Sequence, residues 1–550
     1  MIKFNLVPLY VKTALYLKII QIFNRFSRKF TKYIPISYGS YEVATLEQFD
    51  WNFKFKKKES ILSKNSFLFL NEKHTLSFPE DWNSKNLSKL WLYNLHYFDG
   101  LLCPNTHHEI KNELIKKWVC GNNKISGIGW EPYPISLRSV NWIKFLSSNR
   151  ELINSEILDS LIKQIRFLNN NLEYHLMGNH LLENAKALIF AGFFFRGPEP
   201  EKWLKKGIKL LKDQITEQIL DDGGHFELSP MYHSIVLEIL IDIYRLSSSS
   251  NCSQDLVDER SFLRSIILKM ANWLSVMLHQ DKNISYFNDS SLGIAACPEI
   301  LLNEVEDLLK IKLKKIPFGI THLENSGYIR LSCSKSTLLF DVAEIGPSYQ
   351  PGHGHADCLS FEFSIFKKRL IVNSGTSTYE NCKRRNFERG TLAHSTLSIN
   401  KKNSSEVWNS FRVASRANVT LTKIIKNSKF QQITASHNGY KSMKMRPIHS
   451  RSIKKTKNSL SITDTVNNNN SYNLESRFHI YPDVEIIYES GNKHGRLKLG
   501  NNFISFEIQD CEMIIEDNFY AKGFGLLSKS STICLNNFNK NSANITFRWD

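Results

Sequence analysis

The stretch Pro351-Gly352-His353-Gly354-His355-Ala356-Asp357 lies between two apolar runs, 338–342 and 359–365, that are typical of β-strands. If the stretch is extended, its two histidines and its aspartate point to one face, since strand side chains repeat every two residues. Glycines beside them let a backbone or a ligand approach closely. The pattern indicates a metal or catalytic site in a sheet-forming region. The alternative is that the histidines only hydrogen-bond to their neighbours on a half-buried strand.

The chain before this region is predicted to be mainly helical, because apolar residues recur there at helical spacing. Ser229 and Pro230 suit the start of one helix, as a cap and as a first-turn residue. Long helices with short connections favour antiparallel hairpins, stacked or closed into a ring. The predicted helices span residues 151–170, 180–195, 201–220, 231–246, 261–279 and 303–313.

After about residue 318 the pattern changes to short strands separated by polar turns, one of them at 467–470. We therefore expect an α+β multidomain chain whose last part is a sandwich of antiparallel sheets. The predicted divisions are a lead-in (1–90), a helical domain (91–318) and a β-sandwich (319–550), with the change at 314–325. The predicted strands span residues 327–331, 336–342, 359–366, 395–400 and 477–481.

The composition is that of a globular protein with an anionic partner. Of the 550 residues 42% are hydrophobic and 12% aromatic, too many for a disordered chain. The formal net charge of +18 suits nucleic acid, an anionic membrane or an acidic polysaccharide. Because the chain lacks a basic-aromatic RNA-binding motif, we expect no nucleic acid. The nine cysteines form no CxxC pair and no disulfide framework.

Residues 1–30 are basic and amphipathic. They contain neither the continuous apolar core nor the cleavage site of a secretory signal, and we expect no membrane-spanning helix in the chain. This segment is either an ordinary surface helix or one that touches an anionic membrane. Without a signal the expected compartment is the cytoplasm.

Two polar clusters lie on the predicted helices. In the first, Asn179 and His180 open a helix, and Glu183 lies one turn further on the same face. The second, Asp222 to His233, contains Glu227 and places Tyr232 in the first turn of a helix. A tyrosine there is either a proton donor or acceptor, or an amphipathic core residue.

The aromatic residues Trp130, Tyr133 and Trp142, together with Arg138, are candidates for sugar binding. Aromatic faces stack on the apolar faces of sugars, and arginine pairs bidentately with carboxylates. The alternative is a helical core with an exposed arginine.

A third candidate group lies in the predicted sheets. His394 begins a strand and is expected to join His355 on a metal ion. Three ligands from neighbouring strands, with water in the fourth position, would form a zinc site. The His353/His355/Asp357 run also resembles the metal motif of metallo-β-lactamases, but Cys358 stands where that site has another histidine.

Taken together, helices first and sheets second, these clusters resemble the heparinase II/III family of polysaccharide lyases. The resemblance covers roughly residues 91–550, and motifs at 372–376 and 405–408 are similar to members found with bacterial surface-polysaccharide genes. It rests on Asn179-His180, on Asp222-Gly223-Gly224 through Tyr232-His233, on 352–357, on His394-Ser395-Thr396 and on Trp130 to Trp142.

The resemblance implies an incomplete (α/α) toroid joined to an antiparallel β-sandwich, with the active cleft between them. The implied reaction is β-elimination at a uronic acid, in which a base removes the C5 proton and the C4–O bond breaks. By position, Asn179 is similar to the residue that neutralises the carboxylate and Tyr232 to the general acid, which in some members also serves as the base. His180 and His353 are similar to a base or a second neutralising group, with Glu183 orienting His180.

The family also implies a structural zinc ion held by two histidines and an aspartate. His355 and His394 match the histidines, but Asn373 stands at the aspartate position, and a neutral amide is a much poorer zinc ligand. Asp357 is a possible substitute. Family members act in the periplasm or outside the cell, which conflicts with the cytoplasm expected above.

Two other functions compete with a lyase. The missing aspartate and signal favour a non-catalytic or weakly catalytic polysaccharide-binding protein in surface-glycan assembly. The HxHxD run favours a metal-dependent hydrolase, against which the helix-first order argues.

Overall fold

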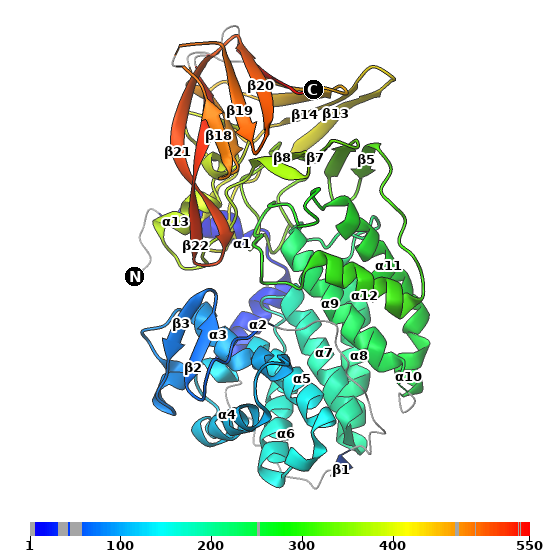
Figure 1. Cartoon of the computed structure of the whole chain (residues 1–550). Helices are drawn as coiled ribbons and strands as arrows, with labels where there is room; N and C mark the ends of the chain where they lie inside the picture. The colour runs from blue at the N-terminus through cyan, green and yellow to red at the C-terminus, as the bar shows by residue number, and fades with distance from the viewer. Residues whose placement is uncertain are drawn as a thin grey trace.

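The structure is a computed structural model, and it describes residues 6–30, 42–43, 58–249, 253–467, 472–489, 491–536, 538 and 541–550. Residues 1–5 of the amphipathic N-terminal segment and 468–470 of the predicted polar turn lie outside this range, as does Cys252. A helical part precedes a β part in the chain, as Figure 1 shows by the change from blue and green to yellow and red.

The helical module extends from Lys89 to Leu309 and is preceded by two N-terminal helices. Five predicted helices coincide with α6, α7, α8, α9 and α11, whereas the predicted helix at 303–313 instead begins at Pro298, a first-turn proline. The helices are α1 (Val7–Ala14), α2 (Ile19–Phe30), α3 (Lys89–Tyr97), α4 (His108–Gly121), α5 (Pro132–Ser148), α6 (Ser155–Asn170), α7 (Asn179–Phe194), α8 (Pro198–Gln218), α9 (Pro230–Ser247), α10 (Gln254–Asp258), α11 (Arg260–Val276), α12 (Pro298–Leu309) and α13 (Lys383–Glu388).

Helix α7 is the centre of the helical module. It packs against α5, α6, α8 and α9, and α9 in turn packs against α11 and α12. Nearly every residue of α7 is buried, which explains its sequence of Leu, Ala, Ile and Phe with almost no polar stripe. The N-terminal residues of α7 and α9 therefore stand at fixed positions on a rigid core.

The β module extends from Gly319 to Arg548. Its strands are β5 (Gly319–Leu323), β6 (Tyr328–Ser332), β7 (Ser336–Asp341), β8 (Phe361–Ile365), β9 (Lys368–Val372), β10 (Leu397–Ile399), β11 (Val407–Trp408), β12 (Arg412–Val413), β13 (Val419–Lys426), β14 (Gln431–His437), β15 (His449–Lys455), β16 (Ser459–Val466), β17 (Leu474–Ile480), β18 (Val484–Ile487), β19 (His494–Leu499), β20 (Asn502–Gln509), β21 (Glu512–Gly523), β22 (Leu526–Asn536) and β23 (Ser542–Arg548). Short ribbons outside the module are β1 (Glu42–Val43) with β4 (Phe195–Arg196), and β2 (Ser66–Phe69) with β3 (Glu72–Thr75).

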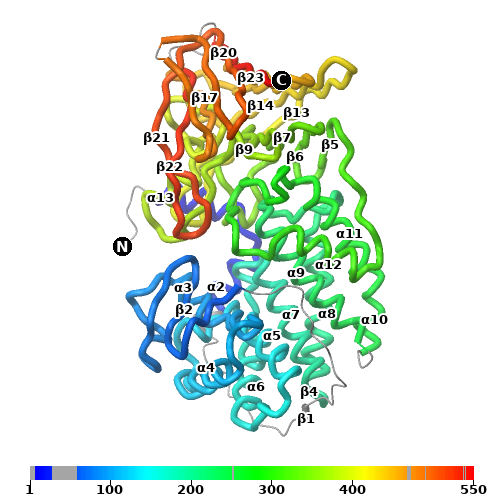
Figure 2. The backbone as a smooth tube through the Cα atoms, viewed as in Figure 1, coloured from blue at the N-terminus to red at the C-terminus, as the bar shows by residue number. Residues whose placement is uncertain are grey.

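Two large antiparallel sheets form the sandwich, which Figure 2 shows at the top of the molecule. One runs in the order β21-β22-β17-β9-β8-β7-β6-β5, with β10 beside β17, and the other in the order β13-β14-β15-β16-β23-β20-β19-β18. Their inner faces share one apolar core that includes Phe363, Phe478 and Phe547. Strands β7 and β8 are buried along their whole length, because this sheet is covered on both faces. The α+β architecture predicted from the sequence is confirmed.

The motif at 351–357 is a loop between β7 and β8, so the condition under which its side chains would share one strand face is not met. Pro351 and Gly354 take part in a turn, in which the amide of Gly354 donates to the carbonyl of Pro351. The two histidines nevertheless approach the same group, as described below.

Candidate active site

A cleft of about 1260 Å³ lies between the helical module and the β module. Asn179 and His180 from α7, Tyr232 from α9 and His353 from the β7–β8 loop all line it. Tyr133, at the start of α5, lines it as well. The four predicted catalytic residues and one predicted sugar-binding residue therefore share one cavity.

Asn179 is the first residue of α7, where the helix dipole and the unpaired backbone N–H groups favour an anion. Its Nδ2 donates to the hydroxyl of Tyr133 at 3.3 Å. Its Oδ1 is buried and has no hydrogen-bond partner among the described residues. An amide held this way at a helix N-terminus can donate to a carboxylate in the cleft.

The residue before α7, Gly178, has a φ of +59°, in the left-handed region. A Cβ at Gly178 would lie 2.5 Å from Oε1 of Glu227 and 3.0 Å from Oε1 of Gln350. Glycine is required here both for the backbone angle and for this close approach.

His180 pairs with a buried carboxylate. Its Nδ1 lies 3.1 Å from Oε1 of Glu173. Burial opposes protonation of the ring, but the carboxylates of Glu173, first, and of Glu227 and Glu131 together outweigh burial and raise the pKa of His180. The same pairing lowers the pKa of Glu173 against the opposing effect of burial. The carboxylate that orients His180 is thus Glu173, whereas the predicted partner Glu183 has Lys186 and Asp242 as its strongest electrostatic neighbours.

Tyr232 lies in the first turn of α9, whose cap is Ser229, as predicted. Its ring stacks on the His353 ring with centroids 3.9 Å apart and an interplanar angle of 29°. Its hydroxyl is 3.0 Å from the hydroxyl of Tyr379. Burial raises the pKa of Tyr232 well above its ordinary value, so the phenol is neutral.

His353 is held by Asp289, a buried carboxylate in the segment between α11 and α12. Its Nδ1 donates to Oδ2 of Asp289 at 2.8 Å, and its Nε2 lies 3.7 Å from Oε2 of Glu227. Burial raises the pKa of Glu227. With Nδ1–H donating to Asp289, Nε2 is the ring nitrogen left to face the cleft, and in the tautomer that this bond selects it carries the lone pair.

Asp289 also binds Arg385, Thr376 and His355. Arg385 Nη2 donates to Oδ2 at 2.7 Å and Nη1 to Oδ1, and the Thr376 hydroxyl donates to Oδ1 at 3.2 Å. Although burial alone would raise the pKa of Asp289, Arg385 and the two imidazoles hold it well below its usual range. This permanently charged carboxylate fixes the orientation of His353.

His355 and His394, the predicted zinc ligands, lie together. Nδ1 of His355 is 3.3 Å from Nε2 of His394, and Nε2 of His355 donates to Oδ1 of Asp289 at 2.8 Å. The third predicted ligand, Asn373, accepts from the backbone amide of Ser395 and donates to the carbonyl of Tyr286. The neutral, doubly hydrogen-bonded amide of Asn373 does not fit zinc, which prefers thiolate, imidazole and carboxylate donors.

The substitute ligand Asp357 does not complete the set. Its Oδ2 accepts from the backbone amide of Asn288 at 3.2 Å, and burial raises its pKa to about 7. His353 and His355 share Asp289, so the HxHxD run does not converge on one ion and the hydrolase hypothesis loses its geometric basis.

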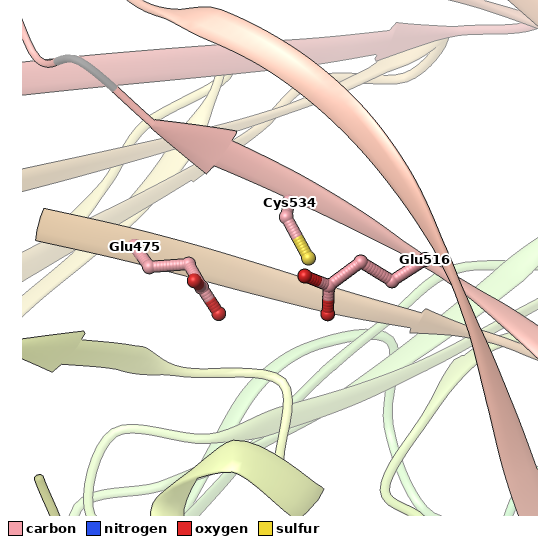
Figure 3. A group of neighbouring side chains, drawn as sticks. All are labelled: Glu475, Glu516 and Cys534. Atoms are coloured by element: carbon pink, nitrogen blue, oxygen red, sulfur yellow. The ribbon is translucent and has the colours of Figure 1, made fainter. Parts of the chain in front are cut away.

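Within the described residues, three His, Cys, Asp or Glu ligand atoms come within 4.8 Å of one another in a different place, at Glu475, Glu516 and Cys534 (Figure 3). Arg477 already binds both carboxylates there, with Nη2 2.8 Å from Oε2 of Glu516 and Nη1 paired with Glu475. This group is an ion-pair network of the sandwich.

Three predicted sugar-binding residues, Arg138, Trp130 and Trp142, lie in the helical core and do not line the cleft. Arg138 is fully buried, donates to Gln164 and to two backbone carbonyls, and lies 3.8 Å from the ring centroid of Trp118. Trp130 is buried and donates to the carbonyl of Asn122 at 3.0 Å. Neither reaches a ligand in the cleft, and Trp142 is likewise buried in the core. These three residues therefore belong to the helical core, which was the alternative to sugar binding. That alternative expected Arg138 to be exposed, but Arg138 is buried.

Sequence reasoning missed four residues of the site: Glu173, Asp289, Tyr379 and Arg385. Each lies in a segment that reads as an ordinary loop or short helix, and Asp289 sits in the run Asn288-Asp289-Ser290-Ser291, which has the composition of a turn. This run is completely buried, which its composition conceals.

Comparison with known proteins identifies the family. The model described as "Heparinase II/III N-terminus" matches residues 122–310, and "Heparinase II/III-like, C-terminal" matches residues 316–550. The chain belongs to the heparinase II/III family. The boundary between the two matches coincides with the change from α12 to β5.

Solved structures share the architecture. A crystal structure of heparinase III has a TM-score of 0.73 at 18% identity, covering 96% of this chain and 88% of that chain. A mutant heparan sulfate lyase HepC from Pedobacter heparinus has a TM-score of 0.60 at 17% identity, covering 87% and 80%. The helical module is therefore the family's toroid and the β module its sandwich, as predicted.

Sequence relatives match over shorter ranges. A heparin-sulfate lyase of Pedobacter heparinus is 28% identical over 272 residues, 45% of this chain and 40% of the relative. A heparin-sulfate lyase of Bacteroides stercoris is 27% identical over 257 residues, 42% and 37%. The chain thus matches about two fifths of the length of these curated relatives.

Proposed function

We propose that this family member is a polysaccharide lyase that cleaves a uronate-containing acidic polysaccharide by β-elimination. One observation carries the proposal: Tyr232 of the toroid stacks on His353 of the sandwich module in the cleft that Asn179 and His180 also line. The names of its relatives, heparin-sulfate lyases, support the same substrate class.

The negative charge of the substrate carboxylate must first be neutralised by groups of the protein. Otherwise removal of the neighbouring C5 proton would build a second negative charge beside it. Asn179 offers an amide N–H and His180 an imidazolium, both at the positive end of α7. The pairing with Glu173 raises the pKa of His180 and so favours its cationic form, and we assign His180 to neutralisation of the carboxylate and not to the base.

His353 is the base in this proposal. Asp289 accepts a hydrogen bond from the Nδ1–H of His353. Its negative charge stabilises the imidazolium that forms when Nε2 takes the C5 proton. Glu227 lies near enough, at 3.7 Å, to stabilise the same charge.

Tyr232 is the acid that protonates the leaving C4 oxygen. The neutral phenol has a proton to give, and the Tyr379 hydroxyl fixes its direction. When His353 takes the C5 proton, the electrons of the C5–H bond form the C4–C5 double bond. The electrons of the C4–O bond stay on the leaving oxygen, which takes the proton of Tyr232.

Incubation with glycosaminoglycans, alginate and acidic bacterial capsules tests the proposal, with the absorbance of unsaturated uronate and product mass spectrometry as readouts. We expect a double-bonded product from at least one polymer, formed about 10³- to 10⁴-fold more slowly by the Tyr232→Phe variant. No product from any polymer contradicts a lyase. Equal glycan binding by both proteins without turnover would favour the glycan-binding alternative.

A further inference from the structure

The N-terminal helices α1 and α2 form a segment that spans both modules beside the cleft, drawn in blue between them in Figures 1 and 2. On the sandwich side, Lys12 Nζ lies 2.8 Å from Oε2 of Glu406, and Trp408 Nε1 donates to Thr13 Oγ1 at 3.2 Å. On the helical side, Lys18 pairs with Glu217. The segment is thus fixed to the body of the protein through its polar side chains.

A second set of side chains from the same segment faces solvent and is apolar. Ile19 is 85% exposed, Leu15 80% and Phe23 69%. Ile19 and Phe23 follow the i, i+4 spacing of one face of α2, whereas Gln21 is buried and lines the cleft. Soluble monomers rarely expose contiguous apolar patches of this kind without a partner.

The charge of the segment indicates which partner. Residues 1–41 contain no aspartate or glutamate, and seven basic residues: Lys3, Lys12, Lys18, Arg25, Arg28, Lys29 and Lys32. A second copy of this chain carries a net charge of +18 and is repelled by such a segment. An anionic lipid surface attracts it and accepts its apolar face.

No helix of the described residues is long and apolar enough to cross a membrane. A cationic amphipathic helix with exposed phenylalanine and isoleucine instead lies in the plane of the lipid headgroups.

We propose that α1 and α2 dock this protein on the surface of an anionic lipid bilayer, with Leu15, Ile19 and Phe23 inserted among the lipids. Because Lys12 and Lys18 bind the segment to both modules, docking also holds the mouth of the cleft beside that surface. This goes beyond the proposed reaction and does not depend on it.

Vesicle flotation of the full chain tests the inference, with vesicles of phosphatidylcholine alone and of phosphatidylcholine mixed with phosphatidylglycerol. We expect binding to the anionic vesicles at low salt, release at high salt, and little binding to the neutral vesicles. The Phe23→Ser variant is expected to bind at least about tenfold more weakly, and Ile19→Ser/Phe23→Ser more weakly still.

Phe318→Ser is the matched control, because Phe318 is also 69% exposed but lies far along the chain, just before β5. It is expected to bind vesicles like the unaltered protein. Circular dichroism and turnover of soluble glycan check that all variants fold, and neither should change since Phe23 does not line the cleft.

Three results would overturn the inference: no binding to anionic vesicles, equal binding to both vesicle types, or equal loss from Phe318→Ser and Phe23→Ser. So would a dimer, measured by light scattering, that Phe23→Ser dissociates. Failure of lyase activity with vesicle binding intact would affect only the proposed reaction.

Discussion

The two sides of the cleft are held in different ways. On the toroid side, Asn179 and Tyr232 stand at helix N-termini and make single side-chain hydrogen bonds to other tyrosines. On the sandwich side, His353 is fixed by Asp289, a buried carboxylate that comes from the segment between α11 and α12 and has three further partners. The difference suggests a division of work, in which the toroid supplies groups that meet the substrate and the sandwich supplies a rigidly oriented base.

Removal of the phenolic proton tests the toroid side most severely. Tyr232→Phe keeps the ring stacked on His353 but removes the acid, so we expect kcat to fall about 10³- to 10⁴-fold with little change in KM. Steady-state kinetics on the polymer that the lyase assay identifies measures this. Tyr379→Phe, which removes only the hydroxyl partner, should cost about tenfold. If both variants lose activity equally, Tyr232 is not the acid.

Asn179→Ala removes the amide that faces the carboxylate. A single preorganised donor of this kind contributes about 10²- to 10³-fold to kcat, and we expect a loss in that range. Asn179→Asp should be worse than Asn179→Ala, because a second negative charge repels the substrate carboxylate. The kcat/KM values of the two variants test whether Asn179 neutralises the carboxylate. If Asn179→Asp is more active than Asn179→Ala, Asn179 does not have this role.

Asp289→Asn should distinguish the support of His353 from the Asn179 and Tyr232 half of the site, because it affects stability as well as rate. The variant leaves the buried Arg385 without its counter-charge, which costs about 3–5 kcal/mol of unfolding free energy. It also removes the acceptor that fixes the His353 tautomer, and kcat should fall about 10²-fold.

Denaturant unfolding and kinetics on the same preparation measure both effects. Tyr232→Phe is the control, since it should lose rate while the unfolding free energy changes by less than about 1.5 kcal/mol. A stable Asp289→Asn protein with normal activity would remove the proposed difference between the two sides.

The toroid side was largely predictable from sequence because it follows local rules. Helical spacing located α7 and α9, and Ser229-Pro230 placed Tyr232 in a first turn. Local spacing left Tyr232 open between a proton donor or acceptor and a core residue, and the resemblance to the family assigned it, together with Asn179, to the cleft.

The sandwich side was less predictable because its contacts join distant segments. Asp289 and Arg385 are 96 residues apart, and neither belongs to a periodic pattern. Arg138 was misplaced for a similar reason: its burial depends on Gln164, His96 and Trp118 from other helices, which spacing within α5 does not reveal. The local sequence shows on which helix or loop a polar residue lies, but tertiary packing decides whether its side chain is buried or exposed.

The smallest expected effect concerns the charge of His180. Glu173 raises the pKa of His180, so the imidazolium persists to higher pH than in a free histidine, and activity that needs it is lost as pH rises through the folded pKa. Glu173→Gln removes the stabilising charge and moves this loss to lower pH. We expect nearly normal kcat/KM on the acid side and a drop of about tenfold near neutral pH.

Glu183→Gln is the matched control for this change. Glu183 lies on the same helix as His180 and is also buried, but its strongest electrostatic neighbours are Lys186 and Asp242. Its pH–rate profile should keep the alkaline limb of the unaltered enzyme. If Glu173→Gln leaves that limb in place, His180 is not the cationic group, and neutralisation of the carboxylate on the toroid side would rest on Asn179 and the N-terminus of α7 alone.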